Sequence, residues 1–222
     1  MQLEIIDLSS IQDRQLPLVN EAYRLWVETY QPILEAAGES LKPEYFFRSK
    51  TMIMIRDEEK VLSFSLNNVL NLGLSGVSDL SYFQEMPLAT FEQLRSERFK
   101  LFTIEWVTVH PDFRARMTKI QQADLIMGLS INSMTHTDCD GAIGYSRIDL
   151  GADRIASRFG ARAQEPTLAH GVECNVMLAR REWVIPHKFK QIQAVVDGLW
   201  NEQINTSSLI KQGPMAPGAA AA

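Results

Sequence analysis

The stretch LFTIEWVTVHPDFRARMTK, residues 101–119, decides the fold. Its first nine residues are apolar or β-branched apart from Glu105, and such a continuous run predicts a buried strand. The Pro-Asp pair at 111–112 ends the strand in a turn. Apolar residues at helical spacing then predict a long helix over 119–136. The stretch therefore predicts a central strand, a tight turn and a long helix.

The sequence after this helix predicts a second strand beside the central one. Residues 142–148 follow an Asp-Gly turn and form a strand run. A strand–helix–strand connection within one sheet is almost always right-handed, so we expect 101–109 and 142–148 to be parallel neighbours. A short helix over 152–159 ends at Gly160, and a last strand spans 167–179.

A strand, a helix and a hairpin precede the central strand. Residues 2–8 form a strand run, and a helix begins at Leu16, which we expect Pro32 to bend or end. The β-rich runs 51–55 and 61–69 are separated by charged residues, which predicts a hairpin with a solvated tip.

Two further segments complete the expected organisation. Residues 73–98 are irregular and long for a loop, so we expect them to be functional or partly helical. We expect one domain over residues 1–185, with an amphipathic helix in 186–210 that packs on it or extends it. Residues 211–222 are rich in Pro, Gly and Ala and predict a disordered tail.

Composition excludes several classes of function. The chain has 222 residues, 45% of them hydrophobic, and a net charge of -5, whereas a nucleic-acid-binding protein needs a dense cationic face. Two cysteines and four scattered histidines do not have the spacing of a metal site. The N-terminus carries Glu4 and does not resemble a signal peptide, and no apolar run reaches the roughly 20 residues that span a bilayer. We therefore expect a cytoplasmic protein without a metal ion or a membrane span.

Two stretches resemble the GNAT superfamily of N-acyltransferases. Residues 107–119 are similar to that family's central strand, Pro-containing turn and donor-binding helix start, and residues 152–161, ADRIASRFGA, are similar to its short helix. The resemblance implies an α/β (α+β) fold with a mixed, largely antiparallel central sheet, a parallel splayed strand pair and helices on both faces. The diverging ends of 101–109 and 142–148 then form the slot for a donor thioester.

The chain departs from the family pattern at two places. The family's donor loop usually contains two glycines that let backbone N–H groups reach a pyrophosphate, but Met117 and Lys119 stand at those positions. The position that often holds a general-acid tyrosine is Ala156. These departures fit either a fold without catalysis or a relative that binds its donor differently. The chain resembles the long-chain N-acyl amino acid synthases and acyl-homoserine-lactone synthases, which can use acyl carrier protein, a donor with a single phosphate.

The resemblance implies a set of site residues. We expect contacts to the donor, coenzyme A or a carrier protein's arm, from Val107, Val109, Arg114, Arg116, Met117, Thr118 and Lys119. The cations among them suit a phosphate or an acidic carrier protein, although an ordinary solvated loop has the same charges.

Two residues are candidates for catalysis. A buried carboxylate must be paired or protonated, and in the resembling family a Glu at the position of Glu105 often deprotonates the acceptor amine. The other reading of Glu105 is a side chain that points outward. Tyr145 lies where the thioester would enter, and its hydroxyl can polarise a carbonyl or return a proton, or it can simply be core. His170 and Cys174 are weaker candidates.

Three functions remain open on the sequence alone. The leading one is transfer of an acyl group from an acyl thioester to a primary amine of a small acceptor such as an amino acid, with acyl carrier protein as a partner. The alternative is a binding or regulatory module that keeps the fold without turnover. A third is an interaction protein that forms oligomers through the helix around Trp200. A pocket open to Glu105 favours the enzyme, and one plugged by Met117 or Phe159 favours the module.

Overall fold

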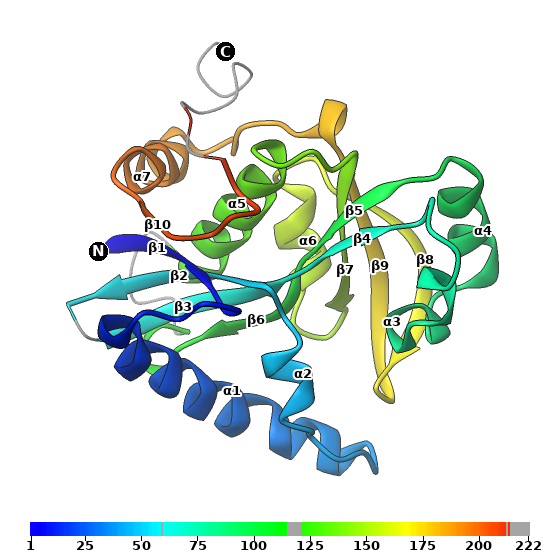
Figure 1. Ribbon diagram of the computed structural model, residues 1–222, viewed down its shortest axis with the longest axis horizontal. Helices are drawn as coiled ribbons and strands as arrows, with labels where there is room; N and C mark the ends of the chain where they lie inside the picture. Colours follow the sequence, from blue (N-terminus) through cyan, green and yellow to red (C-terminus); the bar gives the residue numbers. More distant parts are fainter. Residues whose placement is uncertain (59, 115–120, 212, 214–222) are drawn as a thin grey trace.

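The central strand predicted at residues 101–109 is divided at Ile104 between two sheets. The computed structural model describes residues 1–58, 60–114, 121–211 and 213. In it, β5 (Lys100–Thr103) belongs to one sheet and β6 (Glu105–Val109) to the other. Figure 1 shows the two sheets meeting at this point and turning away from each other. The chain therefore crosses from one sheet to the next within a single extended run.

The first sheet has five strands in the order β10-β1-β2-β3-β6. Neighbours from β1 to β6 are antiparallel, and β10 is parallel to β1. The sheet is apolar on both faces, because Met52 and Met54 of β2 contact one core cluster and Ile53 and Ile55 contact the other. The remaining strands of this sheet are β1 (Gln2–Asp7), β2 (Thr51–Asp57), β3 (Lys60–Asn67) and β10 (Ile204–Asn205).

The second sheet has the order β4-β5-β7-β9-β8. Its pair β5–β7 is parallel, with Leu101 opposite Gly141 and Thr103 opposite Ile143, and the other pairs are antiparallel. The predicted parallel neighbours are therefore confirmed. The other strands of this sheet are β4 (Val69–Asn71), β7 (Gly141–Arg147), β8 (Arg162–Ala169) and β9 (Val172–Arg180).

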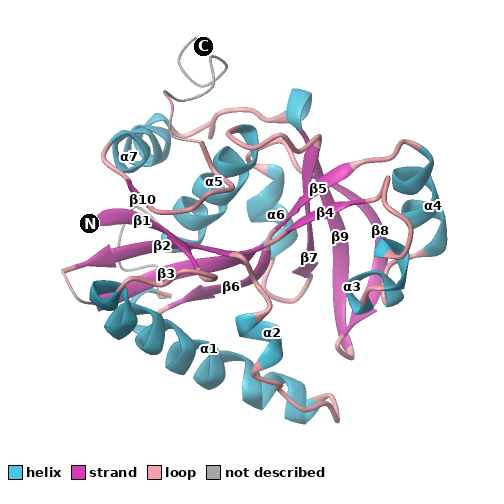
Figure 2. Ribbon diagram, in the orientation of Figure 1, coloured by secondary structure: helices cyan, strands magenta, loops and turns pink. Residues whose placement is uncertain are grey.

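Helices cover both faces of the first sheet, as Figure 2 shows. One face packs against α1, whose buried residues include Leu25 and Trp26, and the other packs against α5. In the second sheet, α6 lies on the α5 side and α3 and α4 lie near β8 and β9 (Figure 1). The helices are α1 (Leu16–Ala36), α2 (Glu44–Phe47), α3 (Ser81–Gln84), α4 (Leu88–Ser96), α5 (Gln122–Thr135), α6 (Ala152–Ser157) and α7 (Lys190–Asn201).

The segment after residue 185 closes one edge of the first sheet. Helix α7 buries Trp200 against α5, and β10 then pairs with β1. The Asp7 carboxylate accepts hydrogen bonds from the Ser9 and Ser208 hydroxyls. Although burial opposes its ionisation, these hydrogen bonds hold the pKa of Asp7 below its ordinary value.

The structure excludes one of the two outcomes expected at Pro32, an end of the helix, and corrects the single strand predicted over 167–179. Helix α1 continues through Pro32 to Ala36, because Tyr30 before the proline and Leu34 after it are both fixed by tertiary contacts. The single strand predicted over 167–179 is a hairpin, in which β8 and β9 are joined by His170 and Gly171. Both turn residues have a positive φ, 49° and 72°, as tight two-residue hairpin turns require.

Residues 73–98 contain α3, α4 and a 3-10 turn, so they are partly helical. The predicted helix over 119–136 is observed as α5, and residues 119 and 120 lie outside the described part of the chain. None of the helices that the structure describes is both long and apolar enough to cross a membrane.

Gly144 permits the close approach of β7 to the point where the central strand divides. A Cβ at this position would lie 2.5 Å from the backbone oxygen of Ile104. We predict that Gly144→Ala destabilises the fold by about 1–3 kcal/mol, because backbone atoms must shift to relieve the contact. Thermal unfolding measures the change, at about 2–4 °C per kcal/mol for a chain of this size.

The matched control for this substitution is Gly198→Ala in α7, where nothing lies within 4 Å of the added Cβ. Since alanine is the better helix former, this control should raise stability by about 0.5–1 kcal/mol. Equal melting temperatures for the Gly144 variant and the parent protein would contradict the prediction.

Candidate functional site

A cavity of about 1040 Å³ opens where β6 and β7 diverge. The parallel pairing ends with the hydrogen bond from the Ile104 N–H to the Ile143 oxygen, 2.8 Å, and β6 then pairs with β3 instead. Walls of the cavity come from β6, β7, α5 and α6, and from α1, α2 and the β8–β9 turn. The cavity therefore lies where two neighbouring strands stop pairing with each other.

A bulge in β6 determines which side chains face the cavity together. Glu105 pairs with Leu66 and Thr108 pairs with Phe64, so two residues of β6, Trp106 and Val107, oppose one residue of β3. Trp106 has a φ of 52°, which is uncommon for a bulky residue. As a result, the consecutive side chains of Glu105 and Trp106 both reach the cavity wall.

The Glu105 carboxylate is 9% exposed and fully engaged with donors. One oxygen accepts from the Thr103 hydroxyl at 2.7 Å and from the Asn68 amide at 3.3 Å, and the other meets Arg48 at 3.2 Å. Each oxygen of this buried carboxylate therefore has at least one partner. The sequence predicted the carboxylate in the cavity wall, but Arg48 was missed because it comes from the end of α2, 57 positions away.

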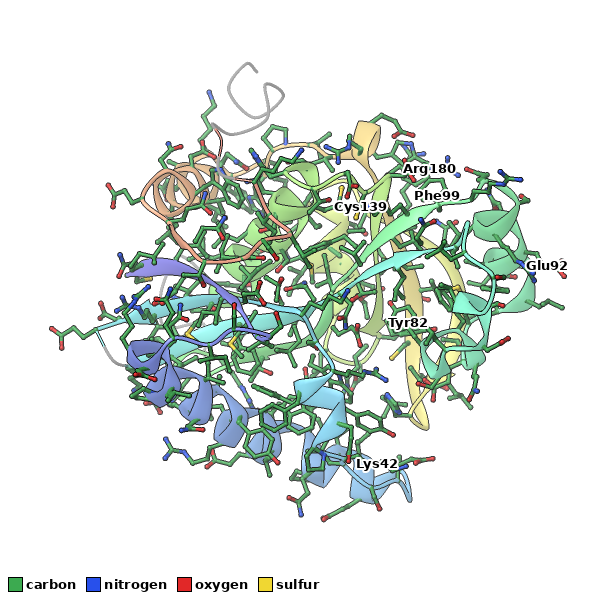
Figure 3. The ribbon with its side chains drawn as sticks, viewed as in Figure 1. Lys42, Tyr82, Glu92, Phe99, Cys139 and Arg180 are labelled. Carbon is green, nitrogen blue, oxygen red and sulfur yellow. The ribbon has the colours of Figure 1, made fainter. Side chains whose placement is uncertain are left out.

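Tyr145 lies on β7 on the same side of the cavity. Its hydroxyl donates to the backbone oxygen of Tyr82 at 2.6 Å, and the Tyr82 hydroxyl donates in turn to the Ile143 oxygen at 3.4 Å. In Figure 3 the labelled Tyr82 lies beside β7. Burial raises the pKa of Tyr145 well above its ordinary value, and the negative charges of Glu85 and Glu105 add to this effect. The phenol is therefore a neutral hydrogen-bonding group that releases a proton only with difficulty.

Aromatic rings surround Trp106. The ring of His170 stacks on it at 5.4 Å between centroids, and the ring of Tyr45 stacks at 5.8 Å. Tyr30 packs edge-on at 4.8 Å and donates its hydroxyl to the Val107 oxygen at 2.7 Å. The sequence analysis missed these residues as a group, since they come from α1, α2, β6 and the β8–β9 turn.

We call this side of the cavity the polar chamber. It is lined by Tyr30, Tyr45, Arg48, Tyr82, Glu85, Glu105, Trp106, Tyr145 and His170. Cys174 of β9 also lies on the wall, where burial raises the pKa of its thiol to about 11, so it stays protonated at neutral pH.

The opposite side of the cavity is apolar, and we call it the apolar arm. Its residues come mainly from the second sheet and from the helices α5 and α6 that cover it. Four of them are alanines, whose small side chains leave space between the sheet and the helices. Phe159 is buried against α5 at Gly128 and does not lie in the cavity wall. The arm consists of Ile104, Met127, Ile131, Ala142, Ile155, Ala156, Ala161, Met177 and Ala179.

Arginines lie around the cavity near the start of α5. Arg114 donates to the Val109 oxygen at 2.8 Å and to the Thr29 hydroxyl at 2.7 Å. Arg158, which directly follows α6, pairs with the buried Asp124 in the first turn of α5 at 2.6 Å, and Arg154 of α6 also lines the cavity. Arg154 and Arg158 were not predicted, because their spacing of four residues alone does not show which side of the short helix faces a cavity.

The predicted donor contacts are located only in part. Val107, Val109 and Arg114 line the cavity. Arg116, Met117, Thr118 and Lys119 lie outside the described residues. The roles of all seven stay predictions.

Solved structures resemble this chain in fold, whereas comparisons of its sequence find no relative. No protein-family model and no curated protein matches the chain. FeeM, an N-acyl amino acid synthase from uncultured soil microbes, aligns over 73% of this chain and 90% of its own, with 15% identity and a TM-score of 0.52. BjaI, a CoA-dependent acyl-homoserine lactone synthase whose structure holds SAM and isopentyl-CoA, aligns over 94% and 95%, with 9% identity and a TM-score of 0.57.

An acyl-CoA N-acyltransferase from Pseudomonas aeruginosa aligns over 81% of this chain and 99% of its own, with 13% identity and a TM-score of 0.50. At these identities the likeness is one of fold. The chain has the acyl-CoA N-acyltransferase fold, and the predicted resemblance to the GNAT superfamily is confirmed at that level.

Tyr30 makes the free energy of unfolding depend on pH in the alkaline range. Burial raises its pKa from 10.0 to about 12, so the folded protein keeps a proton that the unfolded chain releases between these values. The stabilisation is therefore complete below pH 10 and declines as the pH rises to about 12. Tyr30→Phe should reduce this slope by up to one proton, roughly 1.4 kcal/mol per pH unit. Urea unfolding between pH 8 and 12 measures both slopes, and identical slopes would contradict the prediction.

Proposed function

We propose that the protein is an N-acyltransferase that moves an acyl group from an acyl thioester to the amine of a small acceptor. The observation that carries this proposal is the cavity at the divergence of β6 and β7, which has a polar chamber on one side of the strands and an apolar arm on the other. A two-sided cavity brings two substrates together at its centre, and fixed positioning of reactants is a major part of catalysis.

The donor enters from the α5 and α6 side. The arginines there, Arg114, Arg154 and Arg158, attract the phosphate of coenzyme A or of a carrier protein's pantetheine arm. Because the two family glycines are absent, we expect side-chain charge to contribute more than backbone N–H groups. The thioester carbonyl lies between the strands, near the backbone of Val107 and Val109, and the acyl chain extends into the apolar arm.

The acceptor binds in the polar chamber. Arg48 and Glu105 form an ion pair whose two charges complement the carboxylate and the ammonium of an amino-acid zwitterion. Of the five N–H donors of Arg48, one meets Glu105 and another meets Ser81, and the side chain is 33% exposed. Donors therefore remain for a second carboxylate. The aromatic faces of Tyr45 and Trp106 provide apolar contact beside this pair.

The direct test is product formation. Purified protein is incubated with acetyl-CoA, a long-chain acyl-CoA or long-chain acyl carrier protein, together with a panel of amino acids and simple amines. Mass spectrometry detects the amide, and a thiol reagent measures release of the donor thiol. We expect an N-acyl product with at least one pair. If thioesters bind but no amine is acylated, the chain is a binding module and the proposal is wrong.

The apolar arm should set the acyl chain length. Ala142→Leu places extra carbon atoms between β7 and α5, and each methylene of a substrate that no longer fits forfeits about 0.8 kcal/mol. We predict that the ratio of kcat/KM for a long-chain donor to kcat/KM for acetyl-CoA falls by about 10–100-fold in this variant. Met177→Ala, which enlarges the same arm, serves as the opposite variant and should not lower the preference for long chains. A uniform loss for all donors in Ala142→Leu would contradict the assignment.

Arg48 should recognise the acceptor's carboxylate. Arg48→Met keeps the length of the side chain but removes a charged hydrogen bond, which is worth about 1.5–3 kcal/mol. We predict a KM for amino acids that is about 10–100-fold higher, with little change for amines that have no carboxylate. Arg24→Met is the control, since Arg24 is exposed on α1 and pairs only with Glu28 among the described residues. Equal effects on both acceptor classes would remove Arg48 from recognition.

A further inference from the structure

A histidine–carboxylate pair lies at the edge of the polar chamber. His170 occupies the β8–β9 turn and Glu85 follows α3 directly, so the two residues come from segments 85 positions apart. One Glu85 oxygen accepts from the His170 backbone N–H at 2.9 Å and lies 3.7 Å from the ring Nδ1. The two side chains are 29% and 31% exposed, and both line the cavity.

The position of the imidazole is fixed from several sides. Its ring contacts those of Trp106 and Tyr45, at 5.4 and 5.3 Å between centroids, and these two rings also contact each other. The Glu85 segment is held in turn by the Thr167 hydroxyl of β8, which donates to the Glu85 backbone oxygen. His170 has a φ of 49°. The two-residue β8–β9 turn requires this left-handed conformation, so the backbone at position 170 is fixed as well.

The pair shares the chamber with Glu105. Trp106, on which the imidazole stacks, directly follows Glu105 in the bulge. Glu85, Glu105 and Tyr145 all line the polar chamber. Other charged or titratable groups that line this cavity among the described residues include Arg48, which lies over the Tyr45 ring, and Glu39, Arg147 and Cys174.

Glu105 and His170 differ in what each can do for the acceptor amine. Both oxygens of Glu105 already accept hydrogen bonds, from Arg48 on one side and from Thr103 and Asn68 on the other, so its carboxylate is placed to bind a charged partner. An imidazole is the side chain whose ordinary pKa lies closest to neutral pH, which suits proton transfer at that pH. With Nδ1 toward Glu85, Nε2 is the nitrogen left to accept a proton, and the exposed part of the ring lets that proton pass to solvent.

We propose that His170, oriented by Glu85, is the group that takes the proton from the acceptor amine, while Glu105 with Arg48 binds the acceptor. This inference rests on the acyl-transfer function proposed above. The acceptor ammonium gives one proton to Nε2 of His170, and its nitrogen then forms the C–N bond with the thioester carbonyl carbon. As the C–S bond breaks, the second proton leaves the nitrogen and goes to the departing thiolate. The products are an amide and a thiol, and His170 returns the first proton to solvent.

The test compares pH profiles of kcat/KM for the wild-type protein with those of His170→Asn, Glu85→Gln and Glu105→Gln. Asparagine tolerates the left-handed conformation of position 170, so the turn should be kept, and melting temperatures check this. We expect His170→Asn to lower kcat/KM at neutral pH by about 10²–10⁴-fold, with unchanged donor binding. The loss should shrink as the pH approaches the pKa of the amine, and added imidazole should restore part of the rate.

Glu85→Gln should give a smaller loss, because it disturbs only the orientation of the ring. Glu105→Gln should mainly raise the KM for the acceptor and should keep the acidic limb of the pH profile. Loss of that limb in Glu105→Gln instead of His170→Asn would overturn the inference in favour of the sequence-based assignment to Glu105. A His170→Asn variant that keeps its fold and its rate within about threefold at neutral pH would also overturn it.

The two proposals fail in different ways. If the wild-type protein acylates no amine, the proposed function is wrong and the role of His170 is wrong with it. If the wild-type protein is active and the His170 and Glu85 variants follow its pH profile, only the proton-transfer role is wrong. Glu85→Gln keeps the result informative if His170→Asn fails to fold, since the Glu85 side chain remains a hydrogen-bond acceptor for the turn.

Discussion

The fold depends on one constraint, which is that the run from Lys100 to Val109 cannot pair with β7 and β3 along its whole length. Up to Thr103 it is bonded to β7, and from Glu105 it is bonded to β3. Backbone groups buried away from water must find partners, so the change of partner has to occur within very few residues. Ile104 makes the last bond to β7, and the bulge that follows turns β6 away. The cavity exists because β7 of the second sheet does not turn with β6, so the two strands diverge.

The change of partner also separates the chemistry of the cavity into two sides. Successive strand residues normally alternate between faces, and Ile104 and Val107, which lie on either side of Glu105 and Trp106, both contact the apolar cluster under α5. The bulge breaks the alternation once and places Glu105 and Trp106 on the other face together. Buried charge on that face is tolerated because Arg48, Thr103 and Asn68 satisfy the carboxylate. The apolar arm and the polar chamber are therefore adjacent at two consecutive residues, Ile104 and Glu105.

Much of the backbone could be predicted from the sequence, since it is encoded locally. The apolar run at 101–109, the Pro-Asp turn and the helical spacing after it are each readable within a short window, and they give the parallel strand pair. Local signals were less reliable where tertiary contacts oppose them, as at Pro32. They were also less reliable where two residues make a turn inside an apparent strand, as at His170 and Gly171.

The site was less accessible to sequence reasoning than the fold. Glu105 was identifiable because it is the only charge in its strand. Arg48, Glu85, His170 and Tyr30 are ordinary residues in their own segments, and they acquire meaning only when four separate elements meet at the cavity. The general-acid tyrosine of the family pattern is replaced by Ala156, which lines the apolar arm. The proposed function therefore assigns proton transfer to the polar-chamber side.

The most direct test of the central claim is a crystal structure of the protein with a non-hydrolysable long-chain acyl thioester analogue. Our account predicts that the carbonyl of the analogue lies between β6 and β7, with the acyl chain in the apolar arm beside Ala142 and Ala179 and the pantetheine arm leaving past α5 and α6. A donor bound elsewhere, or an acyl chain that lies in the polar chamber beside Glu105, would contradict the account.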